Sequence, residues 1–441
     1  MYASQVFARF AADFATTPLP PEVVHHAKRA VVDWYASYYP GLDTPAVQVL
    51  TRTLADDLDR GTSQLVGGRR ATARAAALIQ GTAAHAAEVD DSFRDAMLHP
   101  GAATIAAALA VAQAVKASGP DLLRAVVLGY EVSTRIGVVM GRPHYKYWHN
   151  TGTIGSFGAA AAAASLLQLD EDAFAHALAI AATFTAGLQQ AFRLEAMAKP
   201  LHAGRAAEAG VLAAQLAAGG MRSSLDVLEG EAGLGQAMST GPDWSTVGAT
   251  LGSDFHITRL TFKNHIGCGH TFPAIDGALE LQQLHGFTHE DIERVALGVY
   301  QSTLDIAPHV DPQNADQARF SLHYMVASAL VHGSVRLSAF EPARLQDPAT
   351  RALMQRIHKA LDPEVDAAFP GRRGARVEIA LRDGRRLSHL QTDRKGDPEL
   401  PLSDKDLEGK LLELASPVIG DAESTALLAR IWRLDRSVNP T

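Results

Sequence analysis

The chain has 441 residues, which exceeds one typical domain and favours two. Hydrophobic residues make up 47% of it but aromatic residues only 6%, so much of the apolar content is alanine, as in a soluble, helix-rich protein. The net charge is −8, with acids and bases interspersed and no basic block, which argues against nucleic-acid binding. No apolar run is long enough to span a membrane.

The cysteine content and the N-terminus indicate the compartment. Cys268 is the only cysteine, which excludes an intrachain disulfide and fits a reducing environment. The N-terminal stretch MYASQVFARFAADF lacks the basic, apolar and small-residue order of a secretion signal. We therefore expect a cytoplasmic protein.

Helical patterns fill the first half of the chain. Two helices are predicted over residues 1–36, separated at Leu19-Pro20-Pro21-Glu22, and Tyr39-Pro40-Gly41 indicates a turn. The segment 141–155 is polar and shows no helical pattern. Further helices are predicted over residues 45–59, 74–87, 102–116, 122–140, 156–167, 174–185 and 208–218.

The pattern changes after Gly252. Asp383-Gly384 is a strong hairpin signal between two of the strand-like runs. The strand-like runs cover residues 257–262, 295–300, 377–381 and 387–391, and helices are predicted over 273–284, 324–332 and 351–361. A capped helix follows from Ser403. We predict a mainly α fold, with an all-helical domain (1–253 plus 400–441) and an inserted, smaller α+β domain (254–399).

One stretch, residues 85–103, carries a dense set of polar groups. It reads HAAEVDDSFRDAMLHPGAA and lies between two alanine-rich helices. Because burying a charge is costly, acids and a histidine at the rim of a core suggest a functional site, although a solvated loop remains the alternative. Its candidates are Glu88, Asp90, Asp91, Ser92 and His99. Asp90 and Asp91 are adjacent and cannot share a helical face, so we expect one to face the site and the other to cap a helix or hold a histidine. Ser92 is expected either to bind substrate or to cap a helix.

Other candidates lie further along the chain. His149 precedes a predicted helix start, whose N–H groups could bind a carboxylate, or it lies on the surface. Lys199 and Lys263 are candidate carboxylate anchors, with an ordinary surface lysine as the alternative. His202, three residues after Lys199, either orients the lysine or packs. Arg193 and Arg205 are second candidate anchors or structural ion pairs.

Five motifs in order resemble the MmgE/PrpD family over nearly the whole chain. They are GTAAHAAEVDDS with HPGAA, WHNTGTIGSFGAAAAAA, AKPLHAGRAAEAG, FKNHIGCGHTFPAID and FSLHYMVASAL. The family includes 2-methylcitrate dehydratase, cis-aconitate decarboxylase and iminodisuccinate epimerase. The resemblance implies a large helical domain with a smaller α/β lid, a homodimer, and no metal or organic cofactor.

The resemblance also implies a site between the domains. Its implied members are Glu88, Asp90 or Asp91, Ser92, His99, His149, Lys199, Lys263, Cys268 and Tyr324. We assign acid–base roles to the histidines His99 and His149, the two aspartates, Cys268 and Tyr324. The remaining groups, with His202 and His265, bind the substrate.

The shared chemistry of the family is proton transfer at a carbon next to a carboxylate or imine, on a small di- or tricarboxylate. Cys268 stands roughly where decarboxylases of the family have a histidine, so we expect a dehydratase or an epimerase, with decarboxylation as an alternative. A non-catalytic dimeric binder of acidic metabolites is a second alternative. A zinc hydrolase using His265, Cys268 and His270 is a third, but the C-x-H spacing is too tight for usual zinc sites. A buried apolar role also fits the cysteine.

Overall fold

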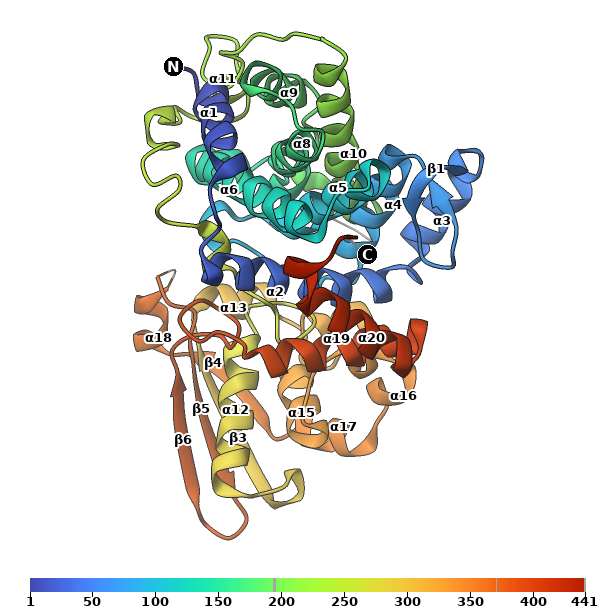
Figure 1. Cartoon of the computed structure of the whole chain (residues 1–441). Coiled ribbons are helices and arrows are strands. Elements are labelled where there is room, and N and C mark those ends of the chain that lie inside the picture. Colours follow the sequence, from blue (N-terminus) through green and yellow to red (C-terminus); the bar gives the residue numbers. More distant parts are fainter. Residues whose placement is uncertain (193–195, 370, 440–441) are drawn as a thin grey trace. The chain divides into compact units, whose positions relative to one another are not determined.

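A computed structural model describes residues 1–192, 196–369 and 371–439 (Figure 1). The fold is mainly α-helical, which confirms the predicted fold class. Contacts between Cα atoms divide the chain into two compact units, Met1–Phe262 with Ser403–Thr441, and Lys263–Leu402. Among the helices that the structure describes, none combines the length and the apolar character that crossing a membrane requires.

The first unit is helical apart from a two-stranded hairpin. Its helices are α1 (Ala3–Thr16), α2 (Pro21–Gly41), α3 (Pro45–Thr53), α4 (Ala73–Ala86), α5 (Pro100–Val115), α6 (Gly119–Tyr145), α7 (Asn150–Thr153), α8 (Gly155–Leu166), α9 (Glu171–Thr183), α10 (Ala198–Ala218), α11 (Leu234–Met238), α19 (Asp404–Ile419) and α20 (Asp421–Trp432). The hairpin joins β1 (Leu58–Gln64) and β2 (Arg70–Ala71).

Small residues let the central helices of this unit approach closely. Helices α4, α5, α8 and α10 pack against one another and bury alanine on most sides. A Cβ at Gly204 in α10 would lie 2.1 Å from Thr82 Oγ1 in α4, and one at Gly210 would lie 2.4 Å from the Cβ of Ala159 in α8. Only glycine allows these two contacts, and they fix α10 against α8 and against α4, the helix that leads into the polar stretch.

Several predicted boundaries in the first unit were wrong. The helix predicted over 45–59 ends at Thr53, and the chain then forms β1. Helix α2 continues through Pro40 to Gly41, where a Cβ would lie 1.8 Å from the carbonyl oxygen of Ala83. Within 141–155, α6 resumes after a kink at Gly141 (φ 62°), and α7 follows. A left-handed glycine lets the chain change direction without ending the helix pattern.

The second unit is built around a four-stranded sheet of order β4-β3-β5-β6. Strand β3 (Ile292–Val299) pairs in parallel with β4 (Ile357–Leu361) and antiparallel with β5 (Ala375–Leu381). Strand β6 (Arg386–Gln391) pairs antiparallel with β5, as the Asp383-Gly384 signal predicted. The helices are α12 (Phe272–His285), α13 (Gln301–Ile306), α14 (Ala315–Arg319), α15 (Leu322–His332), α16 (Pro342–Leu345), α17 (Pro348–Met354) and α18 (Pro363–Ala368).

Two apolar runs adopt a structure other than the predicted one. The run 257–262, predicted as a strand, begins in a 3-10 helix (His256–Arg259), because the buried carboxylate of Glu131 accepts the N–H of His256 at 2.7 Å. The predicted helix over 351–361 ends at Met354, since Ile357 pairs with Val295 in the sheet. Both departures come from partners distant in sequence.

The C-terminal helices pack against the N-terminal part of the first unit. The side chain of Ser403 caps α19, which packs against α2, as does α20 (Figure 1, red beside blue). Lys410 in α19 donates to Asp33 Oδ1 in α2 and to the carbonyl oxygen of Val89, both at 2.6 Å. The C-terminal segment thereby holds the backbone next to Asp90.

Candidate active site

The loop between α4 and α5 brings the carboxylate of Asp90 together with two histidines. Asp90 Oδ2 lies 2.7 Å from Nδ1 of His85 and 3.4 Å from Nδ1 of His99. His85 and Asp90 are almost fully buried, whereas the His99 side chain is 22% exposed. A buried carboxylate therefore supports two imidazoles, and His99 is the one that solutes can reach.

Asp91 has a different environment from its neighbour. It accepts a hydrogen bond from Tyr130 Oη at 2.6 Å and one from the Gly101 N–H at 3.1 Å, at the start of α5. Burial, with a contribution from the nearby Asp33 carboxylate, raises the pKa of Asp91 to about 8. Asp90 thus contacts two histidines, whereas Asp91 lies at the start of α5. Which of the two acids faces a substrate stays a prediction.

A second pair of histidines extends the cluster. Nδ1 of His149 lies 3.1 Å from Nδ1 of His202, and the His149 ring centroid is 5.4 Å from that of His85. Burial and the nearby His85 lower the pKa of both His149 and His202 below the ordinary value. His149 is therefore neutral near pH 7 and can accept a proton. His202 was predicted either to orient Lys199 or to pack. Its ring contacts His149.

Lys199 lies beside an acid of the same loop. Its Nζ is 2.8 Å from Glu88 Oε1, and both side chains are partly exposed. Burial lowers the pKa of Lys199, but the Glu88 carboxylate outweighs it and the net shift is upward. Glu88 has φ of 59°, a region that non-glycine residues seldom adopt, which places its side chain in a constrained position.

Several other candidates of this region have partners within the first unit. The N–H groups of Gly152 and Thr153 donate to the carbonyl oxygen of His149, so these two groups are not available to a carboxylate. Arg205 forms an ion pair with Glu208 on the exposed side of α10. This matches the second of its two predicted roles, a structural ion pair rather than a carboxylate anchor. Ser92 forms an antiparallel bridge with Thr261 through its backbone. Arg193 lies outside the described residues.

The other candidates belong to the second unit. His265 is buried, with Nε2 2.8 Å from Asp276 Oδ1, and Cys268 is buried with its backbone N–H donating to Arg319. Lys263 is partly exposed. Tyr324 is fully buried and its hydroxyl donates to the carbonyl oxygen of Ala339, so within this unit the hydroxyl is not exposed for the acid–base role predicted for it.

Comparison with known protein families identifies the family of this chain. The MmgE/PrpD N-terminal domain matches residues 5–247, and the MmgE/PrpD C-terminal domain matches residues 265–434. The chain belongs to the MmgE/PrpD family. This confirms the resemblance drawn from the five motifs.

Several similar members of the MmgE/PrpD family are named as cis-aconitate decarboxylases or as decarboxylase-like proteins. A cis-aconitate decarboxylase-like protein of Aspergillus oryzae is 29% identical, covering 95% of this chain and 90% of the relative. The cis-aconitate decarboxylase of Homo sapiens is 27% identical (91% and 85%), and that of Mus musculus is 26% identical (94% and 86%). The chain is thus similar to lyases over nearly its full length.

The end of α4 and the loop after it also hold a group of side chains that carry possible metal-ligand atoms. Among the described residues, the one group of three such side chains with these atoms within 4.8 Å of one another is His85, Asp90 and His99. Nδ1 of His99 lies 2.7 Å from the carbonyl oxygen of Asp91, so this nitrogen carries a hydrogen and only Nε2 keeps a lone pair. In the alternative zinc set, His265 is turned to Asp276 and His270 to Tyr300.

His85 is the residue of this site that sequence reasoning missed. It occupies the last turn of α4, five residues before Asp90, and no helical spacing relates the two. The available signal was a histidine at the end of a helix that is otherwise nearly all apolar. Its role became visible only when the loop folded back and placed Asp90 against it.

Proposed function

We propose that this protein is a cofactor-independent lyase or isomerase that transfers a proton at the carbon next to a carboxylate of a small di- or tricarboxylate. The observation that carries the proposal is the partly exposed His99 imidazole beside the buried carboxylate of Asp90. An imidazole held by a carboxylate is a common general base. Lys199 supplies a cation in the same unit.

The tautomer of His99 identifies the reacting nitrogen. A carbonyl oxygen can only accept, so Nδ1–H of His99 donates to Asp91 and the lone pair lies on Nε2. Nε2 is therefore the atom that takes the substrate proton. The charge that develops on the imidazole is stabilised by Asp90.

The two leading reactions differ in the step after proton removal. In a dehydration, the hydroxyl on the neighbouring carbon leaves with a proton from an acid, and a double bond forms. In an epimerisation, a second group in its protonated form returns a proton to the opposite face, and the thiol of Cys268 is our candidate for this donor. His149 is neutral, so its proposed acid–base role is to accept a proton. Lys263 in the second unit is proposed as a second carboxylate anchor.

Decarboxylation is the second candidate, favoured by the names of the similar proteins. In that reaction the bond to a carboxylate breaks, carbon dioxide leaves, and an acid protonates the resulting carbanion. The same His99 can supply this proton in its charged form. The reactions therefore share residues but differ in products.

Incubation with three kinds of substrate in deuterated water separates these reactions. Release of carbon dioxide from cis-aconitate indicates decarboxylation, a new conjugated double bond from a hydroxylated tricarboxylate indicates dehydration, and deuterium uptake without net change indicates epimerisation. Lys263→Ala should weaken carboxylate binding, whereas the exposed Lys405→Met should not. Binding of these acids without exchange or turnover would show a non-catalytic binder and contradict the proposal.

A further inference from the structure

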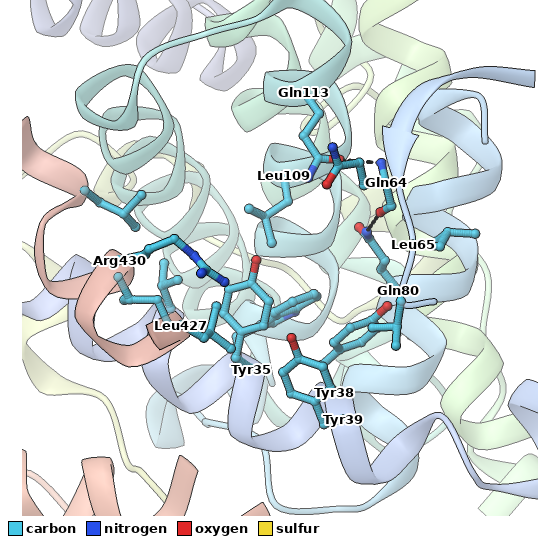
Figure 2. A pocket seen from close by; sticks show the side chains of 15 residues that line it. Tyr35, Tyr38, Tyr39, Gln64, Leu65, Gln80, Leu109, Gln113, Leu427 and Arg430 are labelled. Atoms are coloured by element: carbon cyan, nitrogen blue, oxygen red, sulfur yellow. Dashed lines mark hydrogen bonds between the residues drawn. The ribbon is translucent and has the colours of Figure 1, made fainter. Parts of the chain in front are cut away.

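A cavity lies in the helical unit, lined by residues of α2, β1, α4, α5 and α20 (Figure 2). Its volume is about 180 Å³. None of the described acids and histidines of the candidate active site lines it. It is therefore a separate feature of the first unit, and the proposed reaction does not use it.

Aromatic rings from one helix form a wall of this cavity. Trp34, Tyr35, Tyr38 and Tyr39 all lie on α2. The ring centroids of Trp34 and Tyr38 are 4.9 Å apart with the planes 14° from parallel, and Tyr35 stacks on Tyr39. Flat aromatic walls favour a planar ligand.

Two buried polar atoms of the lining have no hydrogen-bond partner among the described residues: Gln80 Oε1 and Trp34 Nε1. The side chains are 4% and 2% exposed. Gln80 uses only its amide nitrogen, which donates to the carbonyl oxygen of Gln64 at 2.9 Å (Figure 2). An unsatisfied buried acceptor or donor costs on the order of 1–3 kcal/mol, so the pair calls for a partner that the chain itself does not supply.

The charge of the lining favours an anion. Among the described residues that line the cavity, Arg430 is the single ionic side chain and none is an acid. Arg430 pairs with Glu423 at 2.7 Å, but both side chains are about half exposed, and exposed pairs contribute little. Burial raises the pKa of Tyr35 and Tyr39, the latter to about 12, so their hydroxyls stay protonated and can donate to an anion.

We propose that this cavity binds a small aromatic carboxylate with a single ring. The volume is slightly larger than the ~150 Å³ cavity that accepts benzene in another protein. The ring lies against the tyrosines of α2, the carboxylate lies toward Arg430 at the mouth, and a hydroxyl on the ring would donate to Gln80 Oε1. A cation held by the same aromatic wall is the competing occupant, and Arg430 opposes it.

Calorimetric titration of the full-length protein with benzoate tests this assignment. We expect saturable binding, weakened about 10-fold or more in Arg430→Met, since a hydrogen bond to a charged group is lost. Arg433→Met removes an arginine outside the lining and should bind as the parent does. Cyclohexanecarboxylate, with the same charge but no flat ring, should bind less well than benzoate.

Two further variants test where benzoate binds. His99→Ala alters the candidate active site and should leave benzoate binding unchanged, which separates this cavity from that site. Leu109→Trp fills the cavity and should abolish binding, with folding checked by its melting temperature. Equal affinity in Arg430→Met and the parent, absence of benzoate binding at millimolar concentration, or preferential binding of tetramethylammonium would overturn the proposal.

Discussion

The carboxylate of Asp90 lies 2.7 Å from the Nδ1 atom of His85, and the side chains of His85 and Asp90 are 1% and 2% exposed. Because Asp90 also faces His99, one buried anion supports both imidazoles. The pair shows how the loop after α4 is organised: it folds back on the helix that precedes it. Its consequences can be tested at single residues.

Asp90→Asn should lower kcat by about 100-fold or more, the usual contribution of a general acid–base group. The amide keeps the shape of the side chain but removes the charge that stabilises the imidazolium. Steady-state kinetics on the active substrate measures the effect. Asp95→Asn is the matched control, since its side chain is 59% exposed, and it should retain parental activity. Equal loss in both variants would indicate a general effect on the loop.

Glu88→Gln should tighten binding of a polycarboxylate. Lys199 is neutralised by Glu88 across 2.8 Å, and the substitution makes the lysine available to the ligand. We expect an affinity gain of about fivefold, since a partly exposed pair is worth ~1 kcal/mol. Titration calorimetry measures it, with Glu208→Gln as the control on α10. Weaker binding would mean that Glu88 contacts the substrate directly.

Asp91→Asn should change how stability depends on pH. The folded protein holds a proton on Asp91 up to about pH 8, while the unfolded chain releases it near its ordinary pKa of 3.8. Between these values the folded state binds more protons, so this group lowers the free energy of unfolding as pH rises. The stability of the variant relative to the parent should therefore increase from pH 5 to pH 8 in chemical denaturation. A constant difference would contradict the raised pKa.

Lys410→Met should destabilise the helical unit by about 3–5 kcal/mol, because the buried carboxylate of Asp33 loses its ammonium partner. Lys405→Met, in the same helix but exposed, should change stability by less than about 0.5 kcal/mol. Urea denaturation of both variants measures the difference. A small effect in Lys410→Met would show that Asp33 takes up a proton or another partner.

The sequence correctly predicted the helices and strands whose pattern depends on residues close together in the chain. Helices α4 and α5 lie within two residues of their predicted bounds, and the β5–β6 hairpin follows the turn residues between its strands. The run at 257–262 was predicted wrongly because the N–H of His256, directly before it, donates to Glu131, far away in the sequence. Strand β4 was missed because its partner β3 lies some sixty residues earlier.

The candidate site was predictable to a similar extent. Resemblance and residue type pointed to His99, His149 and Lys199, which the structure places in one cluster with Asp90. Sequence spacing could not give His85, which depends on the return of the loop, nor Lys410, which comes from the other end of the chain. It also did not show that the hydroxyl of Tyr324 is turned inward.

Proton exchange by His99→Ala tests the central claim most directly. The parent and the variant are incubated with the active polycarboxylate in deuterated water, and deuterium at the carbon next to the carboxylate is followed by mass spectrometry. We predict exchange in the parent and a rate at least about 100-fold lower in the variant, with ligand binding largely kept. Exchange at the parental rate in His99→Ala would contradict the role of this histidine as the base.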